Sequence, residues 1–144
     1  MLVEAARASG LRSILSQGWA NLTPNDRKED CFSTGDINHE KLFAQVAAIV
    51  HQCGAGTTMA AIWAGRPQVI IPHNYDQFYR ANRVQQTGIG VSDAARDDLT
   101  IDGAVQALHA CLQPEMMVHA ESLAGRIELR GARIAAERLT SKFG

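Results

Sequence analysis

The sequence has 144 residues, of which 46% are hydrophobic and 20% are charged; this is the composition of an ordinary globular domain with a hydrophobic core. Its 14 Lys and Arg residues and 15 Asp and Glu residues give a formal net charge of -1, so the chain lacks the broad positive field that holds a nucleic-acid backbone. The apolar runs are too short to cross a bilayer, and no charged and then apolar leader opens the chain. We therefore expect one soluble domain over residues 1–144, without nucleic acid as a partner.

The three cysteines of the chain are Cys31, Cys53 and Cys111. An odd number cannot all pair within one chain, and their wide spacing matches neither a zinc site nor a disulfide framework. This pattern favours a reducing cytoplasm and predicts no metal site.

Strand-forming and helix-forming segments alternate along the first 91 residues. In chain order we expect a helix over 1–9 ended by Gly10, a strand over 12–18, a polar surface loop over 23–30, a strand over 31–33, a helix over 40–45, a strand over 45–51, a helix over 57–64 ended by Gly65, a strand over 68–71, a helix over 76–86 ended by Gly88, and a strand over 89–91. Residues 101–143 have helical composition, with breaks expected near Pro114 and near Gly125 or Gly131.

This alternation predicts an α/β fold with an open parallel sheet of the Rossmann type. The uninterrupted apolar run in the strand over 45–51 predicts that this strand is buried on both faces. In such folds ligands bind beyond the carboxyl ends of the strands.

A glycine-rich segment, His-Gln-Cys-Gly-Ala-Gly-Thr-Thr over residues 51–58, joins the strand over 45–51 to the following helix. Its glycines let backbone amides approach a ligand at the positive end of the helix, which predicts an anion site. A plain tight turn is the alternative for this segment taken alone.

The chain continues with Ala-Gly-Arg-Pro-Gln-Val-Ile-Ile-Pro-His-Asn-Tyr-Asp-Gln over 64–77, Ala-Asn-Arg-Val over 81–84 and Gly-Ile-Gly-Val over 88–91. From its first helix to about Val91 the chain resembles the donor-binding domain of inverting GT-B glycosyltransferases, and residues 50–77 keep the spacing of the plant signature. That group contains bacterial antibiotic and macrolide transferases, sterol glucosyltransferases and plant secondary-product transferases. The resemblance implies the C-terminal half of a GT-B fold. It also implies hexosyl transfer from a UDP- or dTDP-linked sugar to a hydroxyl of a small-molecule or lipid acceptor, without a further cofactor.

The resemblance assigns the donor diphosphate to the glycine-rich segment. The residues expected to bind it are His51, Gln52, Gly54, Ala55, Gly56 and Thr57, with Thr57 also a candidate helix cap. Gln52 stands where relatives have a second histidine; it keeps an N–H donor but cannot become cationic. Cys53 replaces a glycine of many relatives, and is either a reactive thiol near a helix N-terminus or a buried inert one.

Two further segments are expected to complete the donor site by the same resemblance. Asp76 and Gln77 would bind hydroxyls of the donor sugar, with His73 in the same pocket wall; helix capping and a plain surface histidine are the alternatives. The nucleoside base would lie against Asp36, Ile37 and Asn38, contacted largely through their backbone groups.

The sequence departs from the plant pattern at the nucleoside side. Gly35 occupies the position of a stacking tryptophan, and Ala60 occupies the position of an acid that binds the ribose. We expect Trp63 to lie in the core instead, and Trp19 to lie in a loop.

In the family this domain begins with a strand that residues 1–144 do not contain, and a separate acceptor domain supplies the histidine that acts as general base. We therefore expect the chain to be inactive alone, to need an N-terminal acceptor domain or partner subunit, and to self-associate through an unpaired strand edge. The alternatives are a non-catalytic donor-binding subunit of a two-chain transferase, and a related GT-B enzyme such as a 2-epimerase or a cell-wall N-acetylglucosaminyl transferase.

Overall fold

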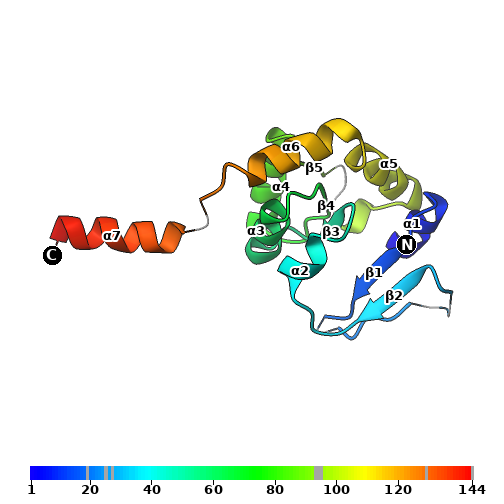
Figure 1. Cartoon of the computed structure of the whole chain (residues 1–144). Helices are drawn as coiled ribbons and strands as arrows, with labels where there is room; N and C mark the ends of the chain where they lie inside the picture. The colour runs from blue at the N-terminus through cyan, green and yellow to red at the C-terminus, as the bar shows by residue number, and fades with distance from the viewer. Residues whose placement is uncertain (19, 25, 27, 93–95, 129, 144) are drawn as a thin grey trace.

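The computed structural model describes the chain except for residues 19, 25, 27, 93–95, 129 and 144 (Figure 1). Its elements are α1 (Leu2–Ala8), β1 (Ser13–Ser16), β2 (Cys31–Thr34), α2 (His39–Phe43), β3 (Ile49–His51), α3 (Ala55–Trp63), β4 (Gln68–Ile70), α4 (Asp76–Gln86), β5 (Gly90–Val91), a 3₁₀ turn η1 (Arg96–Asp98), α5 (Ile101–Cys111), α6 (Pro114–Ala124) and α7 (Gly131–Phe143). From β2 to β5 each strand is separated from the next by a helix, which confirms the predicted α/β class.

The described strands form two parallel sheets instead of the single open sheet that the sequence predicts. One sheet pairs β1 with β2, and the other has the order β3-β4-β5. Within the described part of the chain, β1 pairs only with β2 and β3 pairs only with β4, so each of these two strands keeps a free edge. Because all pairs are parallel, the carboxyl ends of the strands in each sheet lie at one edge.

The central strand β4 is buried along its whole length and packs into two cores. Val69 contributes to a core with residues of α1 and α5, whereas Ile70 contributes to a core with Ala81 and Val84 of α4. Successive side chains of a strand point to opposite faces, so each face of β4 is covered by helices. The loop that follows β4 is therefore held at a fixed place.

The close packing of β5 against β4 depends on Gly90. A Cβ placed on this residue would lie 2.5 Å from the carbonyl oxygen of Gln68 and 2.6 Å from Cγ1 of Val84. Any larger side chain would force the strand or helix α4 to shift.

Two predictions about buried segments are wrong. The strand predicted over 45–51 is only Ile49–His51, and Val50 is 38% exposed, because β3 lies at an edge of its sheet. Trp63, expected in the core, is 44% exposed at the end of α3. Trp19 lies outside the described residues.

The predicted breaks in the C-terminal helical region are confirmed. Pro114 opens α6 at a position where its missing N–H is tolerated, and α6 and α7 are separated by residues 125–130. Helix α7 has no buried residue among those described and extends away from the body of the molecule (Figure 1). No described helix has the length and apolar character needed to cross a membrane.

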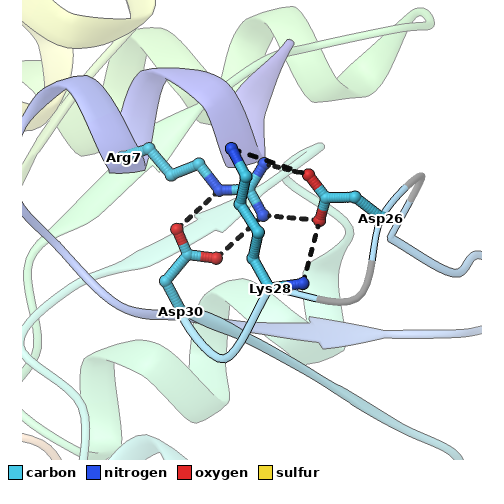
Figure 2. A network of polar contacts seen from close by, with 4 residues as sticks. All are labelled: Arg7, Asp26, Lys28 and Asp30. Carbon is cyan, nitrogen blue, oxygen red and sulfur yellow. Dashed lines mark hydrogen bonds and ion pairs between the residues drawn. The ribbon is translucent and has the colours of Figure 1, made fainter.

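The polar loop over 23–30 is tied to α1 by one arginine (Figure 2). Arg7 Nε and Nη2 donate to the two carboxylate oxygens of Asp30 at 2.6 and 2.8 Å, and Nη1 and Nη2 donate to Asp26 at 2.9 and 2.8 Å. Lys28 Nζ lies 3.9 Å from Asp26. Hydrogen bonds from Arg7 lower the pKa values of the Asp26 and Asp30 carboxyl groups below their usual range. The described residues of the loop lie at the surface, as predicted, but Asp26 and Asp30 are tied to α1.

Candidate functional site

The candidate site lies where three loops follow the carboxyl ends of parallel strands. Residues 36–38 come after β2, residues 52–57 after β3, and residues 73–77 after β4. Because β3 and β4 are hydrogen-bonded neighbours, the second and third loops start side by side. This edge of the sheet is where open α/β folds bind ligands.

The N-terminus of α3 presents backbone amides that the helix itself does not use. Gly54 is the N-cap, and the first helical bond runs from the Thr58 amide to the Gly54 carbonyl at 2.9 Å. The first amides of a helix have no intrahelical acceptor, and no side chain caps those of α3. A Cβ placed on Gly56 would have no atom within 4 Å. Ala55 and Gly56 are also exposed, so this end of α3 is open to solvent, as an anion site needs.

His51 lies behind this loop and supports it from inside. Its Nδ1 accepts the Cys53 amide at 3.0 Å, and its Nε2 lies 2.8 Å from Oε1 of Gln68. A backbone amide can only donate, so Nδ1 is unprotonated and Nε2 carries the proton. Burial lowers the pKa of His51 below its usual value. Both ring nitrogens of His51 are therefore occupied in this structure, and neither is free to make the predicted contact with the diphosphate.

Gln52 and Thr57 lie on the outer side of the loop. Gln52 is exposed, and its Nε2 lies 3.3 Å from the position that a Cβ on Gly54 would take. Thr57 is partly exposed. The neighbouring Thr58 is buried instead, and its hydroxyl donates to the Gly54 carbonyl at 2.9 Å. Of the two threonines, Thr57 is the one that an incoming anion can reach.

Cys53 is fully buried and adopts the left-handed backbone conformation, with φ of 68°. Of the two alternatives for Cys53, the structure thus agrees with a buried thiol. A side chain other than glycine is strained at such φ, and the surroundings have to hold it there. His51 binds the amide of Cys53 and Arg80 binds its carbonyl.

The loop after β4 is fixed by its own side chains. Oε1 of Gln77 accepts the amides of His73 and Asn74 at 2.8 and 3.1 Å, and the NH₂ group of the same carboxamide remains for another acceptor. Tyr75, the N-cap of α4, has a positive φ of 32° and is 94% exposed. Strained, exposed residues of this kind gather at ligand sites.

Asp76 follows Tyr75, and its carboxylate pairs along α4 with Arg80. Nη1 of Arg80 donates to Oδ2 of Asp76 at 2.6 Å, while Nε of Arg80 donates to the Cys53 carbonyl at 2.8 Å. The Arg80 hydrogen bond lowers the pKa of Asp76, which therefore stays ionised. Sequence reasoning missed Arg80: its spacing of four from Asp76 indicates an ion pair on one helix face, but nothing in the sequence points to Cys53.

The segment over 36–38 leads into α2. Oδ1 of Asn38 accepts the Lys41 amide at 3.1 Å and so caps this helix, while Asp36 and Ile37 are exposed. Helix α2 is held near α3 by Phe43, which belongs to one buried cluster with Ala60 and Ala61 of α3. This packing brings the predicted nucleoside segment toward the helix that carries the open amides.

Comparison with known proteins identifies the family of the chain. The profile of the family described as erythromycin biosynthesis protein CIII-like, C-terminal domain, matches residues 21–127. The chain belongs to this EryCIII-like family. The match contains all three loops of the candidate site and both sheet pairs that position the last two loops.

Individual relatives of this EryCIII-like domain are glycosyltransferases. Glycosyltransferase GtfE of Amycolatopsis orientalis is 45% identical over 142 residues, which are 99% of this chain and 34% of GtfE. Vancomycin aglycone glucosyltransferase of the same organism is 44% identical over 95% of this chain and 33% of its own length. The structure of spinosyn rhamnosyltransferase SpnG complexed with thymidine diphosphate superimposes with a TM-score of 0.76 at 19% identity, over 86% of this chain and 35% of SpnG. The EryCIII-like domain thus spans about a third of the length of these proteins.

Proposed function

We propose that this chain is the donor-binding part of a glycosyltransferase that moves a hexosyl group from a nucleoside diphosphate sugar to a hydroxyl of a small-molecule or lipid acceptor. The observation that carries the proposal is the set of open amides at the N-terminus of α3, in front of an unfilled space at Gly56. A UDP- or dTDP-linked sugar is the proposed donor. The complex of SpnG, a structural neighbour, with thymidine diphosphate supports a ligand of this class.

The diphosphate is proposed to lie on residues 54–57. As the bond between sugar and diphosphate breaks, negative charge grows on the leaving group. Backbone amides and the positive end of α3 stabilise that charge without having to reorganise. Gln52 donates a further hydrogen bond from the outer side of the loop, whereas His51 serves by holding Cys53.

The sugar is proposed to lie on the loop after β4. Asp76 is an ionised acceptor and Gln77 keeps an NH₂ donor, so together they can bind neighbouring sugar hydroxyls. His73 is exposed on the same loop. The base is proposed to lie against backbone groups of Asp36, Ile37 and Asn38.

Transfer also needs a partner for the acceptor. Since the chain spans about a third of the relatives that it matches, we propose that an acceptor domain or subunit binds the hydroxyl and supplies the base. The free edges of β1 and β3 are proposed sites of self-association when the chain is alone. The buried, unpaired Cys31, Cys53 and Cys111 support a cytoplasmic location.

Titration calorimetry of the folded chain with UDP and with dTDP tests the proposal. We expect binding of at least one of them, and its loss in Gly56→Leu, whose side chain fills the approach to the amides. Gly131→Leu is a matched control, because a Cβ there also meets no atom within 4 Å but lies at the start of the distant α7. No binding heat in the folded wild type, or equal binding by Gly56→Leu, would contradict the proposal.

A further inference from the structure

One side chain joins the two loops that the proposed function assigns to the diphosphate and to the sugar. Arg80 lies on the second turn of α4, and its side chain is 26% exposed. Its Nε donates to the carbonyl of Cys53, in the loop after β3, at 2.8 Å. Its Nη1 donates to Oδ2 of Asp76, at the start of α4, at 2.6 Å.

The Cys53 carbonyl accepts no hydrogen bond from helix α3, so the Arg80 side chain supplies its donor. Helix α3 begins its hydrogen bonding at the Gly54 carbonyl, so the carbonyl one residue earlier lies outside the helical ladder. Cys53 is also held at a φ of 68°. His51 fixes its amide at 3.0 Å and Arg80 fixes its carbonyl. Cys53, which directly precedes the N-cap of α3, is thus held at both its amide and its carbonyl.

The Asp76 carboxylate is fixed by the same guanidinium. The Asp76 side chain is 70% exposed, and the hydrogen bond from Nη1 goes to Oδ2, so Arg80 does not occupy Oδ1. A planar guanidinium holds its N–H groups at fixed angles, so the place of one partner sets the place of the other. The positive charge of Arg80 is matched by the carboxylate, which argues for a positional role and against direct binding of phosphate.

We propose that Arg80 is a positioning residue that locks the diphosphate loop and the sugar-binding carboxylate of Asp76 into one relative geometry. This inference rests on the proposed function. In this view Arg80 sets the position of the diphosphate-binding loop relative to the sugar-binding carboxylate. It follows that Asp76 contributes to sugar-nucleotide binding only while Arg80 holds it.

A double-variant cycle tests this coupling. Binding of UDP-glucose and dTDP-glucose is measured by calorimetry for the wild type, Arg80→Met, Asp76→Asn and the double variant. We expect each single change to weaken binding roughly tenfold, as for loss of a charge-assisted hydrogen bond, and the double variant to be no weaker than Arg80→Met. Arg80→Lys keeps the charge but lacks the fixed fork, so it should not restore wild-type affinity.

Arg83→Met is the matched control. Arg83 is one turn nearer the end of α4 and exposed, and its side chain bonds only to Gln86 of the same helix within the described residues. We expect wild-type affinity from it, and circular dichroism identifies any variant that has not folded. Additive effects in the cycle, full affinity in Arg80→Met, or rescue by Arg80→Lys would overturn the inference while leaving the proposed function in place. A folded wild type that binds no nucleotide or sugar nucleotide would overturn both.

Discussion

The two ring nitrogens of His51 are both engaged inside the protein, and this has a consequence for stability. The buried ring has a pKa below its usual value, so on acidification the unfolded chain takes up a proton at His51 before the folded chain does. Stability linked to His51 is therefore complete above the ordinary pKa of about 6.5 and falls as the pH drops below it.

We expect the free energy of unfolding to decline between pH 7.5 and pH 5 in the wild type, with His51 contributing at most about 1.4 kcal/mol per pH unit. His51→Gln should be destabilised at pH 7.5 by about 1 to 3 kcal/mol through loss of buried hydrogen bonds, and its decline with falling pH should be shallower. Urea unfolding at several pH values measures this. His109→Gln, on the exposed face of α5, should keep the wild-type slope; a wild-type slope in His51→Gln would contradict the assignment.

Single residues also show what the sequence can and cannot predict about the site. The glycine-rich segment over 51–58 predicts the open amides, because glycine spacing between a strand and a helix has a local cause. The inward position of His51 depends on Gln68, which lies on another strand, and the bridge from Arg80 to Cys53 depends on how α4 packs. Such contacts between distant segments leave no periodic signal in the sequence.

At the scale of elements, the hydrogen bonds of Arg7 with Asp26 and Asp30 join α1 to the loop before β2 and so help to hold the β1-β2 sheet against α1. Because Arg7 lowers the pKa of Asp26 and Asp30, the stabilisation is present above the ordinary pKa of about 3.9 and is lost as the pH falls through the lower folded values. We expect Arg7→Met to be less stable than the wild type at pH 6 and the difference to shrink toward pH 3. Chemical unfolding at both pH values measures it, with Arg12→Met as control, because Arg12 is exposed and lies directly before β1. A difference that persists unchanged at pH 3 would show that the ion pairs are not its source.

The bounds of single elements show where sequence-based prediction succeeds and where it fails. The bounds of α4 agree with the prediction, and Gly10, Gly65 and Gly88 all have the left-handed φ expected of residues that end a helix. The strand over 45–51 was predicted too long, because apolar residues such as Val46 pack beside α2 and α3 without joining the sheet. A run of apolar residues predicts that a segment is buried, but it does not predict whether a sheet or a helix packs against that segment.

For the whole molecule, the proposal predicts that the 144-residue chain produced alone does not transfer sugar. Inverting transfer requires an acceptor held in line with the anomeric carbon and a base that removes its proton, and the base alone contributes roughly 10² to 10⁴ in rate. We expect at most slow hydrolysis when the chain is mixed with UDP-glucose or dTDP-glucose and phenolic, sterol or macrolide acceptors, followed by mass spectrometry. Turnover at an ordinary enzymatic rate, retained in the double variant His51→Ala, His73→Ala, would contradict the assignment of the chemistry to a partner.

The exposed helix α7 has one further consequence. None of its described residues is buried, so its helicity depends on local backbone preference, and a segment of 13 residues is near the length at which an isolated helix is only half formed in water. Warming should therefore melt α7 gradually, as a helix–coil equilibrium, and the negative ellipticity at 222 nm should lose magnitude steadily before the sharp transition of the packed body begins.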